Sequence, residues 1–238
     1  SDDNNLPKEP KSVQIGVRFE APQHYFQKIL DIAYDFKLYQ RPNEKVSLRS
    51  FCTNSGCAYV AEENTYGMKS YNGHSFKNRP NTGMVNFGIM MEVKGIENPF
   101  QFQKDLVKKC NTKDGKGLYY SPGNKRKPSI DSDGNELNIT SIGWLELINV
   151  VEAFDGYFEY IVNYIDDLNK VFKFGDDYGI YIPEVKYLSE EVKVNYEDLS
   201  LIQYPHIHFC GDSLSARGII VSQSQAMAVS DAIIKELK

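Results

Sequence analysis

The chain has 238 residues, 41% of them hydrophobic and 13% aromatic, enough for one large buried core or two small ones. Its formal net charge of -5 argues against a nucleic-acid-binding surface, which needs a basic patch. No apolar run approaches the roughly twenty residues of a membrane span, and the polar N-terminus shows no signal peptide. Four cysteines without a CxxC pair favour reduced thiols in a cytoplasmic protein.

The first half of the chain alternates between strand and turn signals. Residues 1–12 are polar and read as a disordered lead-in, and residues 13–20 alternate apolar and polar side chains, which predicts a strand. Apolar residues at helical spacing then predict an amphipathic helix at residues 24–36. Residues 45–60 read as two strands around the turn Asn54-Ser55-Gly56, because Asn and Gly tolerate positive φ.

Two side chains in this half are candidate reactive groups. Cys52 would act as a redox or nucleophilic group through its thiolate, although a free cysteine is more often a small buried strand residue. Asn72-Gly73 is a turn signal in its own right. His74 follows it and could serve as an acid or base near neutral pH, the alternative being a loop histidine bonded to backbone.

The second half is expected to be more helical. Residues 99–110 predict a short helix, and residues 142–172 predict a long helical region with a break at Asp155-Gly156. Between them, residues 111–138 hold glycine, proline and mixed charge, and are expected to be the least ordered part of the chain. Strands are predicted at residues 179–188 and 191–194.

The C-terminal stretch predicts a strand at residues 207–210, the turn Gly211-Asp212, and a helix that runs to the C-terminus. A helix N-terminus after a tight turn can bind an anion, because its first amides are free and its dipole favours negative charge. The plainer alternative is an ordinary turn with Asp212 as the helix cap. His206 and His208 would face the same side of a strand, but no third ligand has metal-site spacing, so no metal is expected.

Several stretches together resemble one protein family. GDSLSARGIIVSQSQA, from Gly211 onward, is similar to the C-terminal flavin-binding segment of flavoproteins with two dinucleotide-binding domains. Five further stretches resemble the C-terminal, substrate-domain part of the uncharacterised FAD-dependent dehydrogenases, a family of NAD(P)/FAD-dependent oxidoreductases. They are IGVRFEAP, RSFC, YNGHS, the Asn-Phe strand at Asn86 and a Pro-Glu-Val segment. At Cys57, where a glycine is usual, the chain departs from that pattern.

The resemblance implies roles for specific residues. The implied cofactor is FAD, and the residues that would bind it are Gly211, Asp212, Ser213, Arg217, Gly218 and Ile219. The candidate catalytic residues are Cys52 and His74, expected to converge on one cleft. The candidate substrate-binding residues are Arg49, Asn72, Arg79 and Asn86.

The Gly-rich phosphate turn of a dinucleotide fold, GxGxxG after a strand, does not occur in the sequence. The nearest candidate, Gly115-Lys116-Gly117, has Tyr120 in place of the third glycine. We therefore expect the chain alone to bind FAD weakly or not at all. Its partners would be a small-molecule substrate and either a missing flavin-binding half or a dimer partner, with no nucleic acid and no membrane.

The fold expected from these elements is α+β. A mixed, mostly antiparallel sheet with flanking helices would occupy residues 13–174. Residues 175–238 would form return strands and a C-terminal strand-turn-helix. Together with the N-terminal end of the chain they would make a remnant of a dinucleotide-binding α/β domain, in which one apolar face of the last helix is exposed. Two functions remain in view: part of an FAD-dependent oxidoreductase that acts on a small organic substrate, or a non-catalytic binding module without FAD of its own.

Overall fold

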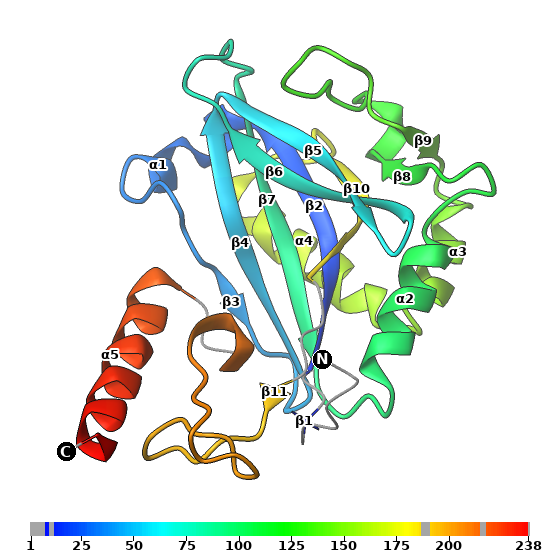
Figure 1. Cartoon of the computed structure of the whole chain (residues 1–238). Helices are drawn as coiled ribbons and strands as arrows, with labels where there is room; N and C mark the ends of the chain where they lie inside the picture. Colours follow the sequence, from blue (N-terminus) through cyan, green and yellow to red (C-terminus); the bar gives the residue numbers. More distant parts are fainter. Residues whose placement is uncertain (1–7, 10–11, 187–190, 215–217, 238) are drawn as a thin grey trace. The chain divides into compact units, whose positions relative to one another are not determined.

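The computed structural model describes residues 8–9, 12–186, 191–214 and 218–237 (Figure 1). The chain divides into two compact units, Ser12–Tyr187 and a second unit made of Ser1–Lys11 with Leu188–Lys238. The boundary between the units comes after the last strand of the larger unit, at residues 187 and 188, whereas the boundary predicted from the sequence is between residues 174 and 175. Each unit is described separately.

The larger unit is built on a seven-stranded sheet with the order β3-β4-β7-β2-β10-β8-β9. Neighbouring strands are antiparallel except β8 and β9, which are parallel. This confirms the predicted α+β class with a mostly antiparallel sheet. The strands are β2 (Val13–Pro22), β3 (Tyr39–Gln40), β4 (Val46–Gly56), β7 (Met84–Val93), β8 (Gly117–Tyr120), β9 (Ile139–Ile142) and β10 (Gly179–Val185).

One face of this sheet carries the hydrophobic core. Alternate residues of β2, from Val13 to Ala21, are fully buried there, and so is the matching set on β7. The helices α2 (Pro99–Lys109), α3 (Leu147–Ala153) and α4 (Phe158–Phe172) pack on this core, and α4 lies behind the sheet in Figure 1. The predicted break between α3 and α4 is confirmed, with φ of 51° at Asp155 and 78° at Gly156.

The other face of the sheet is crossed by a hairpin of β5 (Ala58–Thr65) and β6 (Met68–Ser75) (Figure 1). Its turn is Tyr66-Gly67, where both residues have positive φ, as a two-residue type I′ turn requires. The turn predicted at Asn72-Gly73 is therefore wrong, because both residues lie inside β6. Tyr71, Tyr119 and Tyr181 form a small buried cluster between hairpin and sheet.

Two local predictions need correction. The helix expected at residues 24–36 is reduced to the 3-10 turn η2 (Gln23–Phe26) and the one-turn α1 (Gln27–Leu30). Residues 111–138 contain the buried strand β8, followed by the 3-10 turn η3 (Pro122–Asn124). Because β8 is covered on both faces, its residues lack the polar–apolar alternation that marks a half-exposed strand.

The smaller unit pairs β1 (Lys8–Glu9) with β11 (Glu191–Val192) and ends in the 3-10 turn η4 (Gly211–Leu214) and the helix α5 (Ile219–Glu236). The C-terminal helix is confirmed. The strand predicted at residues 207–210 is wrong, because His208 makes only an isolated bridge with Ser200. Between residues 191 and 214 and from 218 to 237, no helix or strand pairing gives the parallel sheet of a dinucleotide-binding domain.

No helix in the described part of the chain is both long and apolar enough to span a membrane.

Candidate functional site

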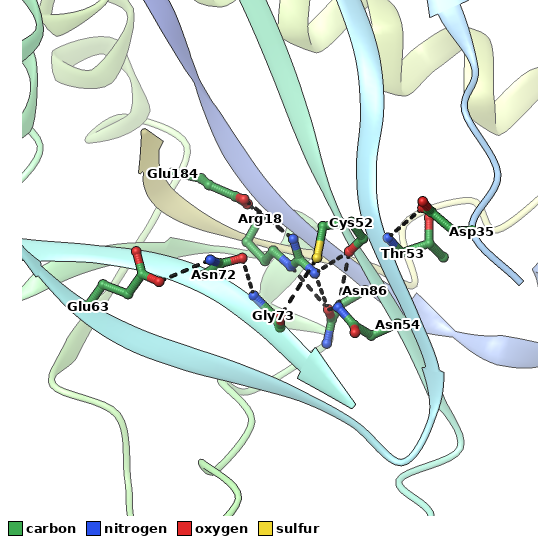
Figure 2. A network of polar contacts seen from close by, with 10 residues as sticks. All are labelled: Arg18, Asp35, Cys52, Thr53, Asn54, Glu63, Asn72, Gly73, Asn86 and Glu184. Carbon is green, nitrogen blue, oxygen red and sulfur yellow. Dashed lines mark hydrogen bonds and ion pairs between the residues drawn. The ribbon is translucent and has the colours of Figure 1, made fainter. Parts of the chain in front are cut away.

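The candidate site is a buried polar network centred on Arg18, between the sheet and the hairpin (Figure 2). Strand alternation places Val17 and Phe19 in the core, so Arg18 and Glu20 point to the opposite face. The β5–β6 hairpin covers that face, and Arg18 is 0% exposed. A charge buried this deeply needs specific partners, because transfer out of water is costly for an unpaired ion.

Arg18 receives those partners from three other strands (Figure 2). Its Nε and Nη2 donate to Asn86 Oδ1 at 3.0 and 2.7 Å, and Nη2 also donates to the carbonyl oxygen of Cys52 at 2.7 Å. Nη1 lies 3.4 Å from the nearer carboxylate oxygen of Glu184. Neutral oxygens therefore make the short contacts, and the ion pair with Glu184 is the longest of the set.

Cys52 reaches Arg18 because of an irregularity in β4. The pairing of β4 with β7 shifts between Phe51 and Asn54, which marks a bulge, and Cys52 has a φ of 51°. A bulge redirects the backbone locally, and here the Cys52 carbonyl accepts from both Arg18 and Asn54 Nδ2, the latter at 3.0 Å. The Cys52 Sγ lies 3.9 Å from the carbonyl oxygen of Gly73 on the hairpin.

Gly73 lets the hairpin approach this closely. A Cβ at Gly73 would lie 1.9 Å from Arg18 Nη2 and 2.3 Å from Asn86 Oδ1, so no larger residue fits without movement. Gly88 likewise leaves space for Glu184, whose Oε1 would lie 2.8 Å from a Cβ added at Gly88. Glycine at these two positions leaves room for the Arg18 and Glu184 side chains.

Two buried carboxyl groups flank Arg18 on the same face. Burial raises the pKa of Glu184 to about 7, although the Arg18 guanidinium opposes the shift. Burial also raises the pKa of Glu20, whose Oε1 accepts from Ser129 Oγ at 2.6 Å and Tyr181 OH at 3.0 Å. Desolvation outweighs the hydrogen bonds to Glu20 and the long ion pair of Glu184, so both carboxyls are able to retain a proton closer to neutral pH than an exposed glutamate.

Three buried polar atoms near this network have no hydrogen-bond partner among the described residues: Glu20 Oε2, Asn86 Nδ2 and Arg126 Nε. Glu20 and Asn86 are directly opposite each other in the β2–β7 ladder, and Arg126 contacts Met84 on the same strand as Asn86. One acceptor and two donors thus gather at this end of the sheet face, a set that can hydrogen-bond a polar molecule.

The structure separates the predicted substrate-binding residues. Asn86 is in the network, and Asn72 lies beside it, accepting from the amide of Gly73 at 2.8 Å and donating to Glu63 at 3.0 Å. Arg49 is elsewhere on the same sheet face, 5.6 Å from the centre of the Phe51 ring. Arg79 is on an exposed loop, where it forms an ion pair with Asp133.

Cys52 and His74 do not share a cleft, so that prediction is wrong. Gly73 faces Arg18, and consecutive residues of a strand point to opposite sides, so His74 faces away from the network. His74 lines a separate cavity of about 400 Å³ with Tyr59, Phe76 and Asp131 among others, and Cys52 does not contribute to it.

The sequence interpretation missed Arg18, Glu20 and Glu184 as site residues. In VQIGVRFE the polar positions looked like the solvent face of a half-buried strand, and Glu184 lies in an apolar run. The available signal was the glycine content of the neighbouring strands: Gly73 and Gly88 sit where the charged side chains pack.

The predicted FAD-binding residues lie in the smaller unit. The Gly211 amide donates to Gln225 Oε1 at 2.7 Å, so it is engaged within the unit. Gly218, with a φ of 117°, precedes α5 and provides no side-chain cap, and Ile219 is 87% exposed. Arg217 and the side chains of Asp212 and Ser213 lie outside the described residues. The described residues therefore supply a helix N-terminus but do not fit a complete FAD site.

No group of three or more His, Cys, Asp or Glu side chains in the described ranges is arranged to hold a metal ion. Comparison with protein-family models finds no match, and comparison with curated proteins finds none either.

Proposed function

We propose that this chain is the substrate-domain part of a cytoplasmic FAD-dependent oxidoreductase that acts on a small organic substrate, with the flavin-binding half supplied by other polypeptide. The observation that carries the proposal is convergence on Arg18. The family-like stretches of the larger unit each contribute to this one network, through Arg18, Cys52, Gly73, Asn86 and Glu184. These residues come from five different strands.

The network suggests what the chain itself would contribute to such an enzyme. It fixes the hairpin to the sheet, and it holds the half-buried Cys52 in a strained conformation at a bulge. Glu184, with a pKa of about 7, can hold or release a proton near neutral pH. These groups would position a substrate and exchange its protons, while FAD, bound elsewhere, would accept the hydride or electrons.

The helix α5 supports association with further polypeptide. Its large apolar side chains are exposed, and they spread over more than half of the helix circumference at 100° per residue. They are Ile219, Ile220, Val221, Met227, Ile233 and Ile234. A helix that is apolar on most sides is normally buried, so a flavin-binding half or a dimer partner would cover it.

The test is to purify the longer polypeptide encoded by the natural reading frame, or the complex captured from native cells by the tagged chain. We expect visible flavin absorbance at one FAD per chain, and bleaching of that absorbance on anaerobic mixing with one class of small hydride donor. Arg18→Lys is expected to retain FAD but slow the bleaching, because a lysine cannot reproduce the forked contacts to Asn86 and Cys52. Absence of flavin from every such preparation would overturn the proposal.

A non-catalytic interaction module is the second candidate. It is favoured by the incomplete FAD site together with the exposed apolar side chains of α5. On this alternative, the captured complex would be stable and colourless. The double variant Ile219→Gln, Ile220→Gln would dissociate the complex. It would not reduce the thermal stability of the isolated chain, because both side chains are at least 80% exposed.

A further inference from the structure

A second cavity, unrelated to the Arg18 network, lies in the larger unit. It is a groove of about 710 Å³ bounded by η2 and α1, by β3 and by the second half of α4. Its volume falls in the range of small-molecule sites. Most of its wall is apolar, with Ile29, Leu38, Leu168, Val171 and Phe172 among the lining residues.

The groove runs along α4, and its two ends are different. At one end β3 is attached to the helix, with Tyr164 OH donating to the Leu38 carbonyl at 2.7 Å and Gln40 Nε2 donating to Asp167 at 2.8 Å. At the other end Phe26 stacks on Phe172 with ring centres 4.4 Å apart. From Tyr164 to Phe172 the helix rises about 12 Å at 1.5 Å per residue, which gives the groove its length.

The charges in the groove are unequally distributed. His24, Lys28 and Lys173 line it at the end of the Phe26–Phe172 contact. Within the described ranges neither lysine has a carboxylate partner. The acidic side chain in the lining, Asp167, is at the β3 end and already accepts from Lys170 Nζ at 2.7 Å and from Gln40.

The apolar wall is unusually open to water for a structural core. Ile32 is 86% exposed, Val171 71% and Tyr39 68%. Burying such surface contributes about 25 cal/mol per Å², so an apolar ligand body would gain binding energy along the wall. An anionic head group on such a ligand would pair with the lysines at that end, whereas a cationic one would meet two positive charges without carboxylate partners.

We propose that this groove binds a linear amphipathic anion, an acyl chain whose carboxylate lies between Lys28 and Lys173. The chain would lie along α4 toward β3, against Leu168 and Val171. The site is independent of the oxidoreductase proposal, because none of its residues belongs to the Arg18 network.

The experiment is a fluorescence titration of the full chain with dansyl-labelled undecanoic acid, with its methyl ester as the uncharged control. We expect saturable binding of the acid at one site, with the ester bound at least about tenfold more weakly, which corresponds to about 1.4 kcal/mol. Lys28→Gln with Lys173→Gln should remove this preference and leave ester binding unchanged. Lys104→Gln with Lys108→Gln is the matched control, because both lysines are exposed on α2 and neither lines the groove.

Val171→Asp tests the apolar wall in a residue exposed enough for the fold to tolerate the change. It should abolish binding of both probes while the melting temperature stays within a degree or two of the parent. Equal affinity for acid and ester, or binding that survives Val171→Asp, would overturn the proposal. So would a dimer in sedimentation experiments that Val171→Asp converts to monomer, because the groove would then be covered by a second copy of the chain.

Discussion

At the scale of single residues, Gly73 determines how closely the hairpin approaches the sheet. In Gly73→Ala the new methyl group would overlap Arg18 Nη2 and Asn86 Oδ1. Overpacking of a buried site typically costs about 1 to 3 kcal/mol, so the melting temperature should fall by several degrees. Gly143→Ala is the control, because there the methyl group meets only the carboxylate end of the exposed Glu146 side chain. Equal melting temperatures for the two variants would mean that the hairpin does not depend on this contact.

Glu184 makes folding stability depend on pH. Its ordinary pKa is 4.5 and its folded-state pKa is about 7, so the folded protein binds the proton more tightly. Its contribution to stability is therefore present below about pH 4.5 and is lost as pH rises through about 7, on the order of 3 kcal/mol in all.

Glu184→Gln cannot titrate, so its free energy of unfolding should fall less steeply over this interval than that of the parent protein. Denaturant titrations at several pH values between 5 and 8 measure the slope. Glu20→Gln should change the slope in the same direction, because burial raises that pKa as well. A Glu184→Gln curve parallel to the parent curve would show that another group causes the pH dependence.

The residues of the network show where sequence reasoning succeeds and where it stops. Cys52 and Asn86 could be singled out because they lie in stretches with a recognisable pattern. Arg18 could not, because alternation predicts which side chains share a face but not whether another element covers that face. His74 was grouped with Cys52 although one residue of offset turns it to the opposite side of β6.

At the scale of elements, α2 shows a helix start that the local sequence specifies. The Asn98 side chain accepts from the Gln101 amide at 3.1 Å, and Pro99 occupies the first helical position. Asn98→Ala is expected to cost about 1 kcal/mol of stability through loss of this cap, measurable by denaturant unfolding, whereas Asn98→Asp should retain most of it. A smaller loss in the Ala variant than in the Asp variant would contradict the capping role.

Elements with strong helical spacing, α2, α4 and α5, were predictable, and so was the break before α4. The hairpin turn was not, because Asn72-Gly73 carries the stronger turn signal than Tyr66-Gly67, yet Gly73 is needed for its close contact with Arg18. The strand β8 was hidden because four residues covered on both faces show no periodicity.

At the scale of the whole molecule, the sheet class followed from the sequence but the function of the smaller unit did not. Its C-terminal helix forms as expected, while the strand before it does not, since the chain there makes only isolated bridges. Short apolar segments form strands when a neighbour pairs with them. In the described ranges, residues 207–210 have no such strand.

The smaller unit and the missing phosphate turn together predict how the isolated chain interacts with FAD. The isolated chain should bind FAD weakly or not at all, because no GxGxxG occurs in the sequence and the Gly211 amide is already engaged by Gln225. Titration with FAD, followed by flavin fluorescence, measures this affinity; tight stoichiometric binding would refute the prediction.

In the longer polypeptide with its flavin-binding half, Asp212→Asn should weaken FAD binding by roughly ten- to a hundred-fold, since a lost charged hydrogen bond costs about 1.5 to 3 kcal/mol. Unchanged affinity there would remove one main support of the flavoprotein proposal.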